Sequence, residues 1–321
     1  MTHPEQTWTL SDGHAGNLRQ VLALAATLAD APASAPVRNI VLATRAPWRW
    51  VAPRVWPGTT HAFGRDFALA LRAAPRIAIG CGRQAALATR MLRAHGSQAV
   101  QILDPRIDPA HWDVVVAPEH DAVRGANVVT LLGSLHPVDD AWLKQAREAF
   151  AALARLPRPR IAVLLGGSSR HARFDRDVFN SLATKLDGVL AREGGSLLLS
   201  ASRRTPPDVR EALRNRHIAA PHVRWLDPGD GDNSYPGMLG WADRIVCTPD
   251  SVNMLSEACA TYAPVFVFDP DRVHGRPRRF IDSLLARGRI RAMDDALAPF
   301  DVEALRETAR VAGEVRKRLD Q

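Results

Sequence analysis

The sequence has few cysteines and no long apolar run. Its three cysteines, Cys81, Cys247 and Cys259, form no Cys-x-x-Cys pair, so neither a disulfide framework nor a cysteine-based zinc site is expected. The N-terminal residues MTHPEQTWTL contain no basic region followed by an apolar stretch, and no window approaches the ~18 apolar residues of a spanning helix. These absences predict a cytoplasmic protein.

Acidic residues are outnumbered by basic ones, and this imbalance indicates an anionic partner. The chain carries 42 Lys and Arg against 34 Asp and Glu, for a formal charge of +8, and its sequence pI is about 10.3. A phosphorylated metabolite, an acidic membrane surface and a nucleic acid would each satisfy that charge. There is no RNP, helix-turn-helix or zinc-finger pattern, so we expect no nucleic acid partner.

Short apolar runs rich in strand-forming residues alternate with helical segments, which is typical of an α/β fold. Strands that crossover helices bury on both faces have continuous apolar runs, so the sheets are expected to be mainly parallel. The predicted strands cover residues 7–10, 39–43, 76–79, 99–103, 113–116, 128–132, 161–165, 196–199, 223–226, 244–247 and 265–268. A length of 321 residues favours two domains.

A proline-containing segment predicts the domain boundary. A helix expected over residues 140–154 runs into residues 155–160, where two prolines block its continuation. We therefore expect an N-terminal domain over residues 1–156 and a C-terminal domain over residues 157–296. The remaining residues, 297–321, are expected to form a helix that packs back on the N-terminal domain.

Two helices are predicted from their apolar stripes. The first is expected to pack on the sheet, and the last, from about Val302, on the N-terminal domain. The stripe of the first helix comprises Leu18, Val21, Leu22, Ala25 and Leu28. The stripe of the last helix comprises Leu305, Ala309, Ala312, Val315 and Leu319.

The loop after the strand 161–165 combines residues that suit an anionic ligand. In open parallel sheets, ligands bind beyond the carboxyl ends of the strands, where helix N-termini point free N–H groups outward. Glycines let a ligand approach the backbone, while hydroxyls and a guanidinium donate hydrogen bonds. A diphosphate fits this loop; the alternative is a plain glycine turn with a serine helix cap. The residues are Gly166, Gly167, Ser168, Ser169 and Arg170.

Two neighbouring strand ends extend the same candidate site. After the strand 196–199 come Ser202, Arg203, Arg204 and Thr205, whose cations either bind the ligand or form solvated surface. Glu257 lies in the second turn of a later helix, where its carboxylate can accept two hydrogen bonds from a ribose diol or simply favour the helix dipole. The segment that contains it contributes Thr248, Asp250, Ser251, Asn253, Met254 and Glu257.

These segments stand in order with further motifs, and together they resemble a known family. The additional motifs are residues 11–17 (SDGHAGN) with Gln20, residues 104–106 (DPR), residues 118–121 (PEHD) and residues 235–237 (YPG). In colinear order over most of the chain, the set resembles the bacterial branch of the mitochondrial-fission family named for the plant "elongated mitochondria" protein.

That family looks like the GT-B glycosyltransferases and is similar in layout to the lipid-linked N-acetylglucosaminyltransferase of peptidoglycan synthesis. The resemblance implies an α/β fold of two Rossmann-like, doubly wound parallel-sheet domains that face each other across a cleft. It implies a nucleoside diphosphate sugar on the second domain, as a substrate, with no cofactor. By the same resemblance, Gly167, Ser168 and Ser169 face the diphosphate, Ser202–Thr205 flank the donor, and Glu257 takes the ribose hydroxyls.

Candidates for catalytic proton transfer come from loops of the N-terminal domain. His14 follows the first strand, and Glu119 and His120 follow the strand 113–116. A neutral imidazole near pH 7 suits deprotonation of an acceptor hydroxyl. The family pattern favours a basic residue where His14 stands, so Glu119 and His120 are the better candidates, with a helix cap as their structural alternative.

Metal chemistry is not expected. The sequence has no H-x-x-x-H, D-x-D or paired-carboxylate motif, and GT-B enzymes generally stabilise a leaving diphosphate with backbone dipoles and basic side chains. Residues 80–83 (GCGR) end another strand of the N-terminal domain. They either take an acceptor phosphate or form a tight turn.

A segment rich in tryptophan and arginine suggests a membrane surface. Residues 45–56 contain Trp48, Trp50 and Trp56 among arginines. Aromatic rings and cations suit an anionic headgroup interface, but the tryptophans could equally pack on the sheet. If exposed, they indicate a lipid-linked acceptor.

Three functions fit these expectations. The first is a metal-independent transferase that moves a sugar from a nucleoside diphosphate donor to an envelope-type acceptor at the inner face of the membrane. The second is a non-catalytic GT-B-shaped scaffold that docks on membranes or partner proteins, because fold does not fix function. The third is a sugar-nucleotide epimerase on the same fold.

Overall fold

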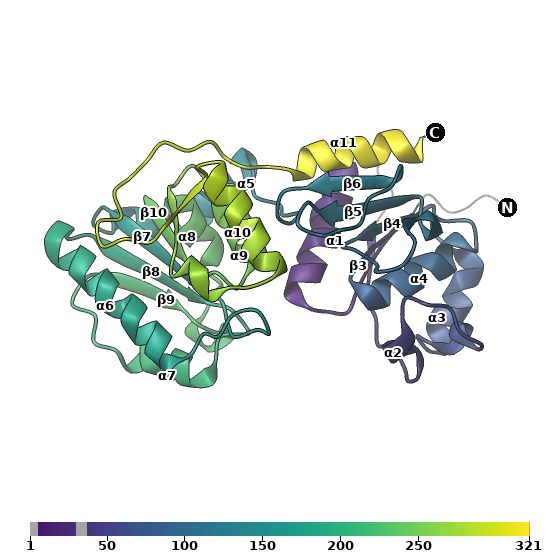
Figure 1. Ribbon diagram of the computed structural model, residues 1–321, viewed down its shortest axis with the longest axis horizontal. Coiled ribbons are helices and arrows are strands. Elements are labelled where there is room, and N and C mark those ends of the chain that lie inside the picture. Colours follow the sequence, from purple (N-terminus) through teal and green to yellow (C-terminus); the bar gives the residue numbers. More distant parts are fainter. Residues whose placement is uncertain (1–5, 30–36, 321) are drawn as a thin grey trace. The chain divides into compact units, whose positions relative to one another are not determined.

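The computed structural model describes residues 6–29 and 37–320 and divides into two compact units. Unit 1 comprises residues 1–137 and 307–321, and unit 2 comprises residues 138–306. Each unit is built on one six-stranded parallel sheet covered by helices (Figure 1). The predicted architecture of two parallel α/β sheets is confirmed. In the described residues, no helix is both long enough and apolar enough to cross a bilayer.

The sheet of unit 1 has the strand order β2-β1-β3-β4-β5-β6. Successive side chains of a strand point to opposite faces, so Ile79 and Cys81 of β3 join one apolar cluster while Ala78 joins the other. Both faces of the sheet are therefore buried. The strands are β1 (Thr7–Ser11), β2 (Val37–Val41), β3 (Ile77–Cys81), β4 (Gln98–Ile102), β5 (Val114–Pro118) and β6 (Val128–Leu131).

Helices cover both faces of this sheet. Helices α1 and α11 pack together on the face of Ile79, and α3 and α4 bury apolar side chains on the face of Ala78. The α-helices of unit 1 are α1 (Ala15–Leu28), α2 (Trp48–Val51), α3 (Arg65–Ala70), α4 (Arg83–Arg93) and α11 (Thr308–Leu319). Short 3-10 turns complete it: η1 (Thr59–His61), η2 (Leu71–Ala73) and η3 (Pro109–His111).

The sheet of unit 2 has the order β12-β11-β10-β7-β8-β9. All the strands predicted for this half are present, and β12 is an addition that the sequence did not suggest. Two of the three residues of β12 are exposed, so it has no apolar run to reveal it. The strands are β7 (Arg160–Leu165), β8 (Ser196–Ala201), β9 (His222–Trp225), β10 (Arg244–Cys247), β11 (Val265–Val267) and β12 (Ile290–Ala292).

The helices of unit 2 also lie on both faces of its sheet. Helices α6 and α7 share an apolar cluster with alternate residues of β7 and β8, such as Val163 and Leu199. The α-helices are α5 (Asp140–Ala149), α6 (Arg176–Glu193), α7 (Pro207–Asn215), α8 (Tyr235–Trp241), α9 (Val252–Cys259) and α10 (Arg276–Ala286). The 3-10 turns are η4 (Ala151–Arg155), η5 (Pro228–Asp230) and η6 (Pro270–Arg272).

Helix α5 belongs to unit 2 because it packs against α8. A Cβ at Gly237 of α8 would overlap the side chain of Phe150, which directly follows α5, so only glycine allows this approach. The units consequently separate at residues 137 and 138, and the proline-containing segment 155–160 lies inside unit 2. The α-helix also ends at Ala149, earlier than predicted, and continues as the 3-10 turn η4.

Two other helical predictions need correction. The last helix begins at Thr308 and not near Val302, because the Leu305 amide donates to the Cys259 carbonyl (2.8 Å) in place of a helical partner. Ala309 is exposed, and Val311 takes its place in the buried stripe. In α1, Leu22 is 41% exposed while Leu24 is fully buried. The spacing predicted the helical period correctly, but the rotation of each helix about its own axis decides which of its residues are buried.

The contact between α5 and α8 gives a stability prediction with opposite signs at two helical glycines. We expect Gly237→Ala to lower the free energy of unfolding by about 1–3 kcal/mol, because the new methyl group would overlap Phe150. Gly188→Ala in α6 should raise it by about 0.5–1 kcal/mol, since its Cβ would meet only the Arg192 guanidinium at 3.6 Å. Urea denaturation of both variants measures this, and equal effects would contradict the packing argument.

Candidate functional site

The strand order of unit 2 reverses between β7 and β10. From β7 the chain runs outward to β8 and β9, and then returns to β10 on the other side of β7. The loops after β7 and β10 therefore leave the sheet in opposite directions, which is where ligands bind in open α/β sheets. Gly166–Arg170 follow β7, and Thr248–Ser251 follow β10, so the sequence-predicted residues lie at this reversal point.

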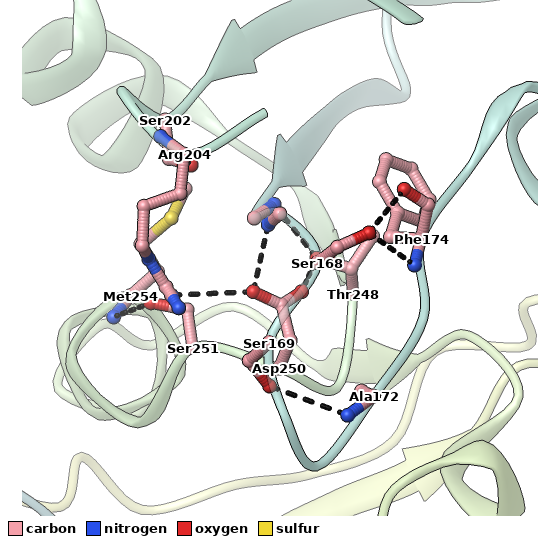
Figure 2. Close-up of polar contacts among 12 residues, drawn as sticks. Ser168, Ser169, Ala172, Phe174, Ser202, Arg204, Thr248, Asp250, Ser251 and Met254 are labelled. Atoms are coloured by element: carbon pink, nitrogen blue, oxygen red, sulfur yellow. Dashed lines mark hydrogen bonds and ion pairs between the residues drawn. The ribbon is translucent and has the colours of Figure 1, made fainter. Parts of the chain in front are cut away.

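Hydrogen bonds join the two loops directly (Figure 2). The Gly166 amide donates to the Thr248 hydroxyl (2.7 Å), which in turn donates to the Asp250 carboxylate (2.8 Å). The Gly167 amide also donates to Asp250 (2.7 Å). The amides of both glycines in the loop predicted to bind a diphosphate are thus bound by side chains from the loop after β10.

The loop after β8 completes the cluster. The Thr205 hydroxyl lies 3.1 Å from the Leu165 carbonyl at the end of β7 and accepts from the Ser202 amide (3.0 Å). This fixes the loop so that Arg204 donates to the Asp250 carboxylate (3.2 Å), as Figure 2 shows. Three strand ends, those of β7, β8 and β10, are therefore tied into one polar cluster centred on Asp250.

Steric exclusion explains the two glycines of this cluster. A Cβ at Gly166 would overlap the Asp250 carboxylate, and a Cβ at Gly167 would overlap the backbone carbonyl of Arg204. Neither glycine has a left-handed backbone. Glycine is required here because neighbouring loops approach closely, and this requirement holds without any ligand.

Asp250 is a buried carboxylate among donors. Its side chain is 1% exposed, whereas that of Arg204 is 50% exposed. Burial raises the pKa of Asp250, and the Gly167 amide, the Thr248 hydroxyl and the Arg204 guanidinium oppose that rise. The carboxylate occupies a position where donors converge, which is the environment that a phosphate oxygen would also prefer.

The two serines of the glycine loop act within the loop. The Ser168 hydroxyl donates to the Phe174 carbonyl (2.8 Å) and accepts from the Phe174 amide (2.9 Å). The Ser169 hydroxyl accepts from the amides of His171 (3.1 Å) and Ala172 (3.2 Å). These contacts shape the turn that leads to α6, whose first turn Asp175 caps. Arg170 is exposed and donates to His171 (2.9 Å).

Helix α9 carries the remaining predicted donor-side residues. Ser251 caps it through a contact to the Met254 amide (3.5 Å), and Asn253 is half-buried in the first turn. Glu257 is buried and accepts a hydrogen bond of 2.5 Å from the Tyr235 hydroxyl. It lies about 8 Å along the helix from its start, at 1.5 Å per residue. Arg203, in the β8 loop, is exposed.

Two residues that set this geometry were not among the site residues predicted from the sequence. Tyr235 stands in the Tyr-Pro-Gly motif, but no spacing rule relates it to Glu257 on another helix. Arg289 is buried and fixes the C-terminal end of α9, because its guanidinium donates to the carbonyls of Cys259 (3.0 Å) and Thr261 (2.9 Å). The sequence shows Arg289 only as one of several arginines near the strand 290–292, so its burial could not be predicted.

Unit 1 has its own strand reversal, between β1 and β3. His14 precedes α1 there with its side chain 83% exposed and 3.9 Å from the Asp12 carboxylate. Asp12 accepts from the His14 amide (3.1 Å) and the Asn17 side chain (3.0 Å). Burial and the charge of Asp12 raise the pKa of the neighbouring Cys81 well above its ordinary value, so this thiol stays protonated.

The structure does not join the three catalytic candidates into one group. Glu119 and His120 follow β5, which is three strands from β1 in the sheet and hence roughly 14 Å away at ~4.8 Å per strand. Glu119 is exposed and His120 is half-buried. His14 therefore lies apart from them along the same sheet edge.

The segment after β3 contacts the tryptophan-rich segment. Arg83 donates to the carbonyls of Arg49 (3.0 Å) and Trp50 (3.4 Å), so its guanidinium holds α2 in place. Trp48 packs against the core, as the structural alternative predicted, whereas Trp50 and Trp56 are exposed. One tryptophan of this segment thus packs in the core, and the other two are exposed as a headgroup interface would require.

Solved structures with the same fold include UDP-GlcNAc 2-epimerases. The UDP-GlcNAc 2-epimerase of Methanocaldococcus jannaschii has a TM-score of 0.59 at 12% identity, covering 98% of this chain and 93% of that chain. The enzyme of Neisseria meningitidis, solved bound to UDP-GlcNAc, has a TM-score of 0.55 at 12% identity, covering 98% and 99%. At this identity the likeness shows the fold alone, which is of the GT-B type.

Sequence comparison gives the family. Mitochondrial fission protein ELM1 of Arabidopsis thaliana is 30% identical over 275 residues, which are 76% of this chain and 64% of that protein. An uncharacterized protein of Rickettsia prowazekii is 25% identical over 201 residues, 60% of this chain and 56% of that protein. The chain thus spans less than two thirds of either relative. The sequence model of the family Mitochondrial fission ELM1 matches residues 15–319, and the chain belongs to that family.

Proposed function

We propose that unit 2 binds a nucleoside diphosphate sugar at the carboxyl ends of β7, β8 and β10, and that the protein transfers the sugar to an acceptor hydroxyl. The observation that carries this proposal is the single polar cluster in which the three loops meet at the strand reversal. Such a reversal is where α/β proteins hold their ligands, and here a half-exposed guanidinium, Arg204, stands over it.

The diphosphate would compete with Asp250 for its donors. Arg204 and the Gly167 amide both donate to that carboxylate, and a phosphate oxygen can replace it only if Asp250 is neutral or turns away. The raised pKa of Asp250 favours the neutral form. Arg170 and Arg203 are exposed beside the cluster and supply further positive charge to a leaving diphosphate.

The ribose would compete with Tyr235. Glu257 accepts from the Tyr235 hydroxyl, so a vicinal diol reaches the carboxylate only when that hydroxyl is displaced. A carboxylate that exchanges one phenol donor for two ribose hydroxyls gains a charge-assisted hydrogen bond. The sugar nucleotide is thus proposed to bind with a change at α8.

The acceptor side of the proposal rests on unit 1. Glu119 with His120, or His14, would take the proton of the acceptor hydroxyl, since all three side chains lie at the carboxyl edge of that sheet. Exposed Trp50 and Trp56 favour an acceptor on a lipid, at the inner face of the membrane. The UDP-GlcNAc held by the Neisseria enzyme of the same fold supports the donor class.

A second candidate is a non-catalytic scaffold. The specific observation in its favour is that Asp250 already satisfies the Gly167 amide and Arg204, so the cluster is complete by itself. The mitochondrial fission name of the Arabidopsis relative agrees with such a role. Ligand binding decides between the two candidates, and conversion of the donor without any acceptor would identify an epimerase instead.

The proposal predicts opposite effects of two variants on nucleotide binding. Glu257→Gln should weaken the binding of a UDP- or GDP-sugar by about 1–3 kcal/mol, because a neutral amide accepts ribose hydrogen bonds less well. Tyr235→Phe should strengthen binding, because no phenol must be displaced. Thermal shift with a panel of sugar nucleotides, followed by titration calorimetry on the best, measures both.

The controls separate binding from stability. Both variants disturb one buried hydrogen bond, so their unfolding midpoints without ligand should fall together. A panel in which no sugar nucleotide shifts the wild-type midpoint would reject the donor and leave the scaffold. Equal weakening in the two variants would show that Glu257 acts only through Tyr235.

Asp250 predicts a pH dependence of ligand affinity. Its folded pKa lies above the ordinary value of 3.8, and a bound diphosphate would raise it further, so binding takes up a proton. Affinity for a UDP-sugar should therefore increase as the pH falls toward the pKa of Asp250 in the free protein. Asp250→Asn should remove most of this dependence and bind more tightly at neutral pH.

Titration calorimetry over a pH series measures this dependence of affinity on pH. A UDP-sugar is a suitable ligand, because its esterified diphosphate does not change protonation near the pKa of Asp250. The same linkage acts on stability: ionisation of Asp250 above its unfolded pKa disfavours the folded state, so wild-type stability should decline with rising pH more than that of Asp250→Asn. Identical pH profiles of affinity in the two proteins would disprove the competition between Asp250 and the diphosphate.

A further inference from the structure

A pocket of about 460 Å³ lies in unit 1, beside the C-terminal end of α4. Its walls come from that helix end, from residues 55–60 and from η3, and its volume is within the range of small-molecule sites. Arg90 and Arg93 stand two to three turns beyond Arg83, the start of α4, which is roughly 10–15 Å along the helix. The pocket is thus distinct from the strand ends where His14 and Arg83 lie.

Arginine and histidine side chains supply much of the polar lining of the pocket. Arg90, Arg93, His95 and His111 line it together with Thr59 and Thr60. Asp113 neutralises Arg93 (3.0 Å). Arg90 has no carboxylate partner within the described residues: it donates to the Pro53 carbonyl (2.7 Å) and lies 5.9 Å from the centre of the Trp112 ring.

Two residues that line the pocket have lowered pKa values, mainly because they are partly desolvated. Burial lowers the pKa of Arg90. Burial is the largest cause of the lowered pKa of His111; the charge of Arg90 and, to a smaller extent, that of Arg93 add repulsion, against the opposing charge of Asp108. An anion in the pocket would relieve that repulsion.

We call residues 49–56 the rim because Val55 lines the pocket, and this segment carries exposed apolar side chains. Val55 lines the pocket and is 54% exposed, next to Trp56 at 53%, and Trp50 on α2 is 66% exposed. Arg49 precedes Trp50 in the sequence and Arg54 precedes Val55; both arginines are exposed. A stretch with exposed tryptophans, a valine and arginines has the composition of a lipid headgroup interface.

Hydrogen bonds hold this rim on α4. Arg83 donates to the carbonyls of Arg49 and Trp50, and Arg90 donates to that of Pro53. The backbone that carries these side chains is therefore fixed on α4, with Trp50 near the start of the helix and Val55 at the pocket. A bound partner would meet charge and apolar surface at the same time.

We propose that this pocket binds the phosphate of an anionic phospholipid headgroup while Trp50, Val55 and Trp56 enter the interfacial layer of the membrane. A soluble phosphate would use the cations alone and leave the apolar rim in water, whereas a lipid surface covers both. The site needs no nucleotide and is independent of the donor site proposed on unit 2, but it extends the proposed lipid acceptor, which rests on the same exposed Trp50 and Trp56.

Vesicle co-sedimentation of the full chain tests the proposal. The protein should sediment with vesicles of phosphatidylcholine and phosphatidylglycerol in equal parts, much less with phosphatidylcholine alone, and less at high salt. Arg90→Gln should weaken binding about fivefold, the equivalent of ~1 kcal/mol per cation at an anionic surface. Trp50→Ala with Trp56→Ala should weaken it about tenfold or more.

Matched controls come from exposed residues elsewhere. Arg155→Gln removes an exposed arginine of η4 in unit 2, and Leu22→Ala removes an exposed leucine on the opposite face of the unit 1 sheet. Neither should change vesicle binding. Circular dichroism establishes that each variant is folded, and the tryptophan pair is a valid test even if Arg90→Gln is unstable.

Three results would overturn the proposal. Equal sedimentation with neutral and anionic vesicles would remove the role of the cations. Losses in the controls as large as those in the test variants would show only general adsorption of a basic protein. Thermal stabilisation by glycerol 3-phosphate that Arg90→Gln abolishes, without any vesicle binding, would assign the pocket to a soluble phosphate. Vesicle binding that persists without a response to any UDP-sugar would instead support this site while rejecting the donor site.

Discussion

The close approach of three strand-end loops at Asp250 is the constraint on which the rest of unit 2 depends. The loops after β7, β8 and β10 meet so tightly that neither Gly166 nor Gly167 has room for a Cβ, and Asp250 takes donors from two of the loops and from Thr248. Without the glycines, β7 could not end beside β10. The starts of α6 and α9, and with them Glu257, are positioned by this contact.

The same contact determines whether the donors of this cluster are available to a ligand. The Asp250 carboxylate accepts hydrogen bonds from an amide, a hydroxyl and a guanidinium. A phosphate oxygen of a bound ligand would accept hydrogen bonds from the same kinds of donor. Because burial raises the pKa of Asp250, the balance between carboxylate and ligand depends on one proton. Under the function proposed above, an enzyme and a scaffold would differ only in whether Asp250 gives up its donors to a ligand, with no difference in fold.

Much of the fold was predictable from sequence, since continuous apolar runs identify buried parallel strands. The hydrogen bonds between residues far apart in the sequence were not predictable. Gly167 and Asp250 are 83 residues apart, and the glycine motif alone fits a ligand as well as it fits a carboxylate of the same chain. The hydrogen bond between Tyr235 and Glu257 could not be predicted for the same reason, because it depends on how α8 and α9 pack. The rotation of a helix, which exposes Leu22 and buries Leu24, likewise depends on tertiary packing.

Comparison of the two strand reversals shows what glycine-rich loops mean in this chain. At both, a glycine is crowded by a side chain of the opposite loop: Gly82 would place a Cβ 2.9 Å from the Asn17 amide, and Gly166 has no room beside Asp250. At both, an aspartate accepts from the donors of the turn. Glycine and aspartate therefore follow from the reversal itself and do not identify a phosphate site. The cations differ between the two reversals: the Arg83 guanidinium donates to carbonyls of α2, whereas the Arg204 guanidinium donates to Asp250 within its own reversal, so we expect an anionic ligand at a strand reversal on unit 2.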